Sequence, residues 1–166
     1  MNREFRPELI SRKGEWTAWI LSIIALASLG VAWIWGTGMS WAGIVFVLIL
    51  LLSAGSISLG NWVDRKTVLS LIPEGVGFRN GLRNVSLKWD QIQELRVLPD
   101  RWGERVHVWG TESRFNFRTL GEVKVRGELK GRVGFAEGES ILQEILESSN
   151  LQEIEQNENG RYYARP

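Results

Sequence analysis

His107 is the only imidazole in the chain and so the only histidine that could act as a general base or a metal ligand. The sequence contains no cysteine, which excludes thiolate nucleophiles, disulfides and zinc sites that need sulfur. Val106 and Val108 flank His107 in an alternating pattern, so the imidazole is predicted to face outward. No serine, cysteine or aspartate stands at a spacing that suggests a catalytic partner. We therefore expect His107 to be a surface residue.

Asp90 and Glu94 are spaced one helical turn apart and could be interpreted as paired carboxylates. A cap on the turn after Trp89 is the role that better fits Asp90, because aspartate accepts hydrogen bonds from free backbone N–H groups there. The glycine-rich stretches lack the spacing of phosphate-binding loops. The sequence therefore predicts no catalytic residue, no metal site, no cofactor and no enzymatic activity.

A second group of polar and aromatic residues lies in two alternating segments, 105–109 and 114–118, separated by four residues. A hairpin with a four-residue turn would place Trp109 opposite Arg114, His107 opposite Asn116, and Arg105 opposite Arg118. Opposed arginines destabilise a sheet unless an anion lies between or above them. A lipid phosphate, an acidic partner, or the chain's own acidic segment from Glu144 to Glu158 could supply that anion. The predicted interaction surface is Arg105, His107, Trp109, Arg114 and Arg118, and a solvated strand edge is the alternative.

The elements that position these residues are β-strands. Between residues 64 and 150, about seven short alternating segments follow one another at intervals of 8–12 residues, which is typical of an antiparallel sandwich or barrel. Asn80-Gly81 is a strong hairpin signal, since both residues tolerate positive φ. Near the end the period becomes helical, with apolar residues at Ile141, Leu142, Ile145 and Leu146. We expect a β domain over 64–150 with one carboxy-terminal helix, followed by an acidic, flexible tail over 151–166.

The amino-terminal part is of another kind, because the 48 residues 16–63 contain no charged side chain and no histidine. The segment divides at residues 36–40, which leaves two apolar runs, 16–35 and 41–62, each long enough to cross a bilayer as a helix. A buried soluble hairpin and a cleaved signal peptide fit these runs less well. Two rows of small residues are expected to face each other between the helices: Ala18, Ser22 and Ala25 against Ser53, Ser56 and Gly60. Tryptophans mark the ends of both runs and are predicted membrane-interface anchors: Trp16, Trp19, Trp33, Trp35, Trp41 and Trp62.

Orientation follows from the basic residues beside the two spans. Lysine and arginine occur in the tail 1–15 and directly after the second span, at Arg65 and Lys66, but not in the connecting turn. Positive residues stay on the cytoplasmic side, so the sequence predicts a two-span protein of the cytoplasmic (inner) membrane with both termini in the cytoplasm.

Residues 73–81 (Pro-Glu-Gly-Val-Gly-Phe-Arg-Asn-Gly) and 87–95 (Leu-Lys-Trp-Asp-Gln-Ile-Gln-Glu-Leu), together with the two spans, resemble bacterial membrane proteins with a pleckstrin-homology-like (PH-like) domain. The resemblance implies a seven-stranded antiparallel barrel capped by a carboxy-terminal helix, without enzymatic activity. The loop at 73–75 has an acidic residue and no lysine or arginine, so phosphoinositide binding does not carry over. The layout is also similar to a photosystem assembly factor of cyanobacteria and chloroplasts.

The charge distribution narrows the class of partner. Lysine plus arginine number 20 against 19 aspartate plus glutamate, which argues against a nucleic-acid binder. Residues 64–132 are basic, with 14 cationic against 9 acidic residues, whereas residues 133–166 have 2 against 7. We expect an integral membrane protein whose cytoplasmic domain is a protein-interaction scaffold, assembly or regulatory module for a membrane-associated protein. The alternatives are a sensor that binds anionic lipid headgroups or a small ligand, and a photosystem-assembly-like factor.

Overall fold

The computed structural model describes residues 2–9, 11–36 and 40–165. The chain divides into two compact units, and each is described by itself. Residues 11–62 form a helical unit, and residues 1–10 join residues 63–166 in a β domain. The amino-terminal tail, predicted to be a separate segment over 1–15, is therefore largely part of the β domain.

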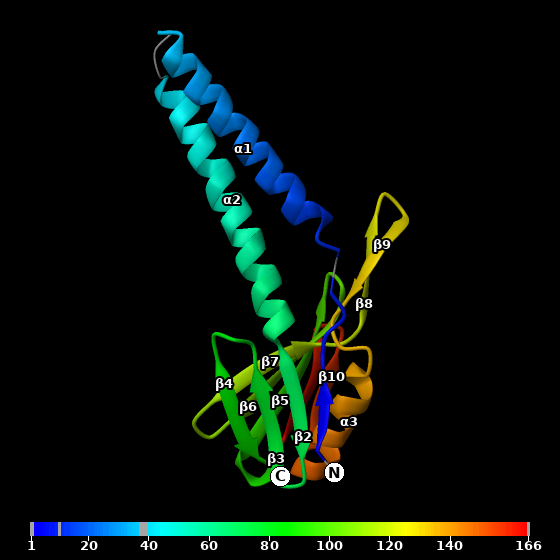
Figure 1. The fold of residues 1–166 in the computed structure, drawn as a ribbon. Coiled ribbons are helices and arrows are strands. Elements are labelled where there is room, and N and C mark those ends of the chain that lie inside the picture. Colours follow the sequence, from blue (N-terminus) through cyan, green and yellow to red (C-terminus); the bar gives the residue numbers. More distant parts are fainter. Residues whose placement is uncertain (1, 10, 37–39, 166) are drawn as a thin grey trace. The chain divides into compact units, whose positions relative to one another are not determined.

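The helical unit contains α1 (Lys13–Ile34) and residues 41–62 of α2 (Trp41–Lys66), whose last four residues belong to the β domain. Figure 1 shows the two helices. Both helices are long and apolar enough to cross a membrane. Gly36, with φ of +69°, follows α1, and its N–H bonds to the carbonyl of Trp33. Residues 37–39 of the predicted turn lie outside the described residues. The side chains of the six predicted anchor tryptophans are all exposed.

Two rows of small residues were predicted to face each other between the helices, and the structure agrees with the first row at Ser22 but not with the second. Ser22 is fully buried, as expected for the first row. On α2, however, Ala54 is buried, so the prediction of the second row was wrong. Its three members are all exposed: Ser53, Ser56 and Gly60. Ser58 follows Ala54 by four residues, which places it on the same helix face. Hydrogen bonds join this end of the hairpin: Trp19 Nε1 donates to Ser58 Oγ (2.8 Å), Ser58 Oγ to Glu15 Oε1 (2.9 Å), and Asn61 Nδ2 to Glu15 Oε2 (2.8 Å).

The β domain contains three antiparallel sheets, none closed into a barrel. The first sheet has the order β1-β2-β3-β4, with bounds Arg3–Phe5, Val68–Ile72, Gly75–Arg79 and Asn84–Lys88. The second sheet has the order β10-β11-β5-β6-β7, with bounds Gln152–Asn157, Gly160–Ala164, Ile92–Asp100, Gly103–Gly110 and Arg114–Arg118. The third sheet is the hairpin of β8 (Gly121–Val125) and β9 (Glu128–Val133). The described residues thus form eleven strands, and the prediction of a closed seven-stranded barrel was wrong.

Local turn chemistry explains the β3–β4 connection. Asn80 Oδ1 accepts hydrogen bonds from the N–H groups of Leu82 (3.2 Å) and Arg83 (2.9 Å), and Gly81 adopts φ of +79°. An asparagine that bonds the backbone two and three residues ahead, followed by a glycine with positive φ, fixes a tight turn. The hairpin predicted from Asn80-Gly81 is confirmed, with a loop of four residues between the strands.

The short 3₁₀ turn η1 (Trp89–Gln91) corrects the role given to Asp90. Gln91 closes this turn, since its Oε1 accepts the backbone N–H of Lys88 at 3.0 Å. Asp90 is exposed and has no hydrogen bond to a described residue, so the prediction that it caps the turn was wrong.

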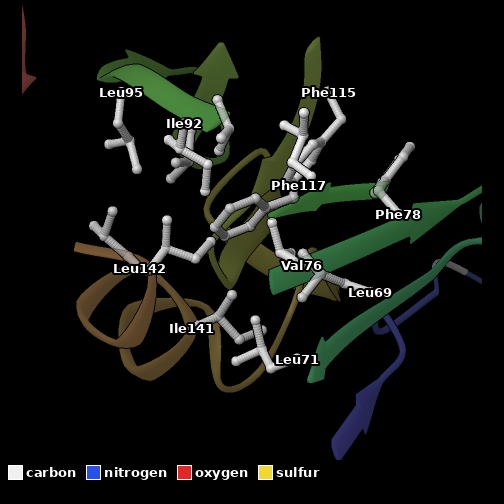
Figure 2. Close-up of a cluster of buried hydrophobic side chains, with 14 of the residues drawn as sticks. Leu69, Leu71, Val76, Phe78, Ile92, Leu95, Phe115, Phe117, Ile141 and Leu142 are labelled. Carbon is white, nitrogen blue, oxygen red and sulfur yellow. The ribbon is translucent and has the colours of Figure 1, made fainter. Parts of the chain in front are cut away.

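The core lies between the two larger sheets and α3 (Gly138–Ser149). Figure 2 shows side chains from both sheets and from α3 pointing toward one another. Phe117 packs edge-to-face on Phe135, with ring centroids 5.9 Å apart. The predicted alternation is confirmed on β6, and the apolar face of α3 is buried as predicted. The largest fully buried side chains of this core are Leu69, Leu71, Val76, Ile92, Leu95, Val97, Val106, Val108, Ile141 and Ile145.

Both ends of the chain add strands to this core. The tail predicted to be flexible over 151–166 instead forms β10 and β11, and β11 pairs with β5. Tyr163 is buried there opposite Leu95. At the other end β1 pairs with β2, so that Phe5 lies opposite Leu69 (Figure 1). The terminal segments form strands for a physical reason. Without them, β2 and β5 would have unpaired backbone N–H and C=O groups along one edge, and β1 and β11 satisfy these groups.

Candidate interaction face

The register of β6 and β7 brings the five predicted site residues onto one surface. Arg105 lies opposite Arg118, His107 opposite Asn116, and Trp109 opposite Arg114, which are the three pairs expected from the sequence. Val106, Val108, Phe115 and Phe117 alternate with them and are buried. The outer face of this hairpin therefore carries its polar side chains together with Trp109.

Two strands distant in the sequence extend the surface. Arg96 on β5 lies opposite His107, and Tyr162 on β11 lies opposite Arg96. One row of side chains thus runs across four strands, from Tyr162 through Arg96 and His107 to Asn116. The name basic–aromatic face is used below for Arg96, Arg105, His107, Trp109, Arg114, Asn116, Arg118 and Tyr162.

Arg96 lies at the centre of the basic–aromatic face. Its guanidinium carbon is 5.0 Å from the ring centroid of Trp109 and 5.6 Å from that of Tyr162. It also pairs with Glu94 on its own strand. The cation over Trp109 therefore comes from β5 and not from Arg114, the residue opposite Trp109 on β7. A guanidinium held against two aromatic rings loses less conformational entropy on binding than a free one.

The anion that compensates Arg105 and Arg118 also differs from the expectation. Both guanidinium groups donate to Oδ2 of Asp100, at 2.8 Å and 2.5 Å. The anion is thus a residue of β5, and none of the three predicted sources supplies it. Asp100 shares a face with Arg96 because the two are four residues apart on one strand. That spacing was the sequence signal for this contact, but predicting the contact from it requires knowing that β5 pairs with β6.

The surroundings of His107 disfavour protonation of its ring. Its ring stacks on Trp109 with a centroid distance of 5.2 Å, and it has no hydrogen bond to a described residue. Partial burial lowers the pKa of His107, and the charges of Arg105, Arg96 and Arg114 lower it further. Among the described residues, no carboxylate is hydrogen-bonded to the ring to orient it as a general base.

Arg114 is the cation left available for a ligand. Its side chain is exposed and makes no ion pair with a described residue, unlike Arg96, Arg105 and Arg118. Asn116 is exposed beside it and offers a donor and an acceptor. This end of the basic–aromatic face can accept a carboxylate without first breaking an internal ion pair.

The described residues contain no group of three or more histidine, cysteine, aspartate or glutamate side chains arranged to hold a metal ion. No protein-family model matches the chain, and neither a curated protein nor a solved structure is significantly similar to it.

Proposed function

We propose that this protein is a non-enzymatic, membrane-anchored binding module whose basic–aromatic face docks an acidic segment of a membrane-associated protein. It would act as a scaffold, assembly or regulatory component of a membrane complex. The observation that carries the proposal is the contact of the Arg96 guanidinium with the rings of Trp109 and Tyr162, next to Arg114, which makes no ion pair with a described residue. Arginine, tryptophan and tyrosine are the side chains that contribute most to protein interfaces.

The proposed docking site covers a smaller part of the surface than the sequence suggested. Asp100 already compensates the charges of Arg105 and Arg118, so a carboxylate of a partner protein gains more from Arg114, which makes no ion pair with a described residue. The docking site proposed here is therefore the other end of the face, formed by Arg96, His107, Trp109, Arg114 and Tyr162. A glutamate or aspartate of the partner would bind Arg114, and apolar parts of its chain would cover the aromatic rings.

We infer that α1 and α2 cross the cytoplasmic membrane and leave both termini in the cytoplasm. Apolar side chains are exposed along both helices, and lipid would cover them. The pairing of β1 with β2 supports an even number of crossings, because segments before and after the helices share one sheet. The arginine and lysine residues beside the helices support the cytoplasmic side.

We further infer that the centre of the β domain is PH-like. Two consecutive three-stranded meanders, β2-β3-β4 and β5-β6-β7, precede a helix that packs on both, which supports the resemblance. In this interpretation β1, the β8–β9 hairpin and the β10–β11 hairpin are additions to the domain. The basic–aromatic face then depends partly on an addition, since Tyr162 belongs to β11.

Site-specific photo-crosslinking in the native membrane tests the docking proposal. A crosslinking amino acid at Asn116 should capture a defined protein partner, whereas the same group at Ser86, exposed on β4 of the other sheet, should not. Arg114→Glu should reduce the Asn116 crosslink about tenfold or more, because it opposes an acidic partner with a negative charge. Arg83→Glu is the matched control, being an equal charge reversal on the exposed β3–β4 turn. Identical crosslinks in the Arg114→Glu and Arg83→Glu proteins would refute the proposed site.

A further inference from the structure

A cavity of about 330 Å³ lies within the β domain, away from the Arg114 end of the basic–aromatic face. Its lining comes from segments 7–9, 63–67 and 133–135 and from β3, β6 and β7. The volume is at the lower end of the range for small-molecule sites in proteins. The cavity therefore suits a compact ligand or a headgroup.

The lining combines an apolar wall with opposite charges. Phe78, Phe117 and Phe135 provide aromatic carbon, and all three side chains are largely buried. The charged residues are two arginines, Arg105 and Arg118, and two acids, Glu8 and Asp64. The lining thus presents charges of both signs, although Asp100, outside the lining, is bonded to both arginines. Such a lining suits a ligand that itself carries both signs.

Arg118 has donor capacity beyond its bond to Asp100. Its Nε is buried and has no hydrogen-bond partner among the described residues. A buried donor without an acceptor costs free energy, which an incoming oxygen can recover. Arg105, on the facing strand, lines the same cavity. Paired guanidinium groups suit the oxygens of a phosphate, which they bind in a bidentate manner.

Asp64 lines the cavity and lies near the carboxy-terminal end of α2. It belongs to α2 and follows Trp62, the last residue of the predicted span, by two positions, a rise of about 3 Å. If α2 spans the membrane, Asp64 lies at the level of the lipid headgroups. Its carboxylate and that of Glu8 could accept hydrogen bonds from an ammonium group.

We infer that this cavity binds a phosphoethanolamine group, with the phosphate on Arg105 and Arg118 and the ammonium on Asp64 and Glu8. The source is either the headgroup of phosphatidylethanolamine or a free phosphoethanolamine compound. The lipid source rests on the membrane attachment proposed above, but the chemistry of the cavity does not.

Titration calorimetry on the full chain in detergent tests the cavity with soluble O-phosphoethanolamine. O-phosphocholine is the matched ligand, because it keeps the phosphate and the positive charge but has no N–H donor. We expect phosphocholine to bind about tenfold more weakly or worse, since the hydrogen bonds to Asp64 and Glu8 are lost. Asp64→Asn should reduce this preference, and Arg118→Gln should weaken both ligands. Asp90→Asn and Arg83→Gln, at exposed sites outside the cavity, should change neither.

Several results would overturn the inference. They are no binding of phosphoethanolamine at millimolar concentration, equal affinity for phosphocholine, equal affinity for inorganic phosphate, or equal affinity for β-alanine, which replaces the phosphate by a carboxylate. If Arg118→Gln fails to fold, Asp64→Asn still tests the inference, because a substitution at an exposed residue should leave the fold intact.

Native mass spectrometry of the same protein then separates the two sources. Retention of phosphatidylethanolamine over phosphatidylcholine in mixed micelles identifies the lipid, whereas binding of the soluble compound alone identifies the free source. These measurements need neither a membrane nor a protein partner. Failure of the docking proposal therefore leaves them intact, and their failure leaves the docking proposal intact.

Discussion

Arg105 and Arg118 lie directly opposite each other on β6 and β7, and a single oxygen, Oδ2 of Asp100, accepts a hydrogen bond from each of them. Two like charges on facing strand positions repel each other. The carboxylate of a third strand compensates this repulsion and links β5, β6 and β7 on their outer face.

Asp100→Asn should destabilise the β domain. The substitution keeps the shape of the side chain but leaves two arginines facing each other without an anion, and we expect a loss of about 1–3 kcal/mol. Thermal unfolding of the full chain in detergent, followed by circular dichroism, measures the effect. Asp90→Asn, at an exposed acid without a hydrogen-bond partner among the described residues, is the control. Adding Arg105→Gln to Asp100→Asn should restore part of the loss, and no restoration would contradict the repulsion argument.

The same carboxylate predicts a pH dependence. The backbone N–H of Arg101 and the guanidinium groups of Arg118 and Arg105 lower the pKa of Asp100. The stability that it contributes is therefore complete above the unfolded-state pKa of about 4 and is lost as the pH falls through the lower folded-state value. Wild-type protein should lose more of its unfolding free energy than Asp100→Asn between about pH 5 and pH 2. Parallel acid-denaturation curves for the two proteins would be evidence against it.

His107 provides a direct measure of the field on the basic–aromatic face. It is the only histidine, so its ring resonances need no assignment by mutation. Burial and three arginines lower its pKa, so folding disfavours the protonated ring, and the domain loses stability as the pH falls below about 6.5. Arg114→Glu should raise the pKa of His107 in an NMR titration, whereas Arg83→Glu should leave it unchanged. An equal shift in both variants would mean that Arg114 has no specific effect on the ring.

Phe117 tests the assignment of inward and outward positions on β7. Its side chain is 4% exposed and packs on Phe135 in the core. Phe117→Ala should lower the unfolding free energy by about 3–5 kcal/mol, because it leaves a cavity among buried rings. Asn116→Ala, at the next residue on the exposed face, should cost less than about 1 kcal/mol. If the two substitutions cost the same, the register of β7 is wrong by one residue.

The sequence was most informative where the pattern is local. The alternation along residues 105–109 and 114–118 predicted the facing pairs, and helical periodicity predicted the buried face of α3. Charge compensation at Arg105 could not be predicted in the same way, because Asp100 reaches it only through the pairing of β5 with β6. Tyr162 joins the site for a similar reason, since its strand was assigned to a flexible tail on composition alone.

Gly134 is a position where the backbone itself excludes a side chain. It has φ of +101°, and an added Cβ would lie 2.2 Å from the carbonyl oxygen of Thr119. Its own carbonyl accepts the N–H of Glu8 at 2.7 Å. Gly134→Ala should cost at least about 1–3 kcal/mol from backbone strain and should also loosen the amino-terminal segment. Limited proteolysis within residues 1–10 measures the second effect. Gly131→Ala, where the added atom meets open space, is the control. It should neither lower the stability in this way nor increase proteolysis of the amino-terminal segment.

The pairing of β1 with β2 makes the topology of the chain testable at three points. Arg3–Phe5 and Leu69–Leu71 are neighbours in one sheet, although both helices lie between them in sequence. If the helices cross a membrane, both segments must then be on the same side. The basic residues beside the helices indicate that this side is the cytoplasm: Arg12, Lys13, Arg65 and Lys66.

A reporter active only in the periplasm should therefore be silent before Met1 and after Pro166, and active when inserted at Gly38. The reverse pattern would overturn the orientation but keep the β1–β2 pairing. Activity at one terminus alone would be incompatible with the shared sheet, because it requires an odd number of crossings.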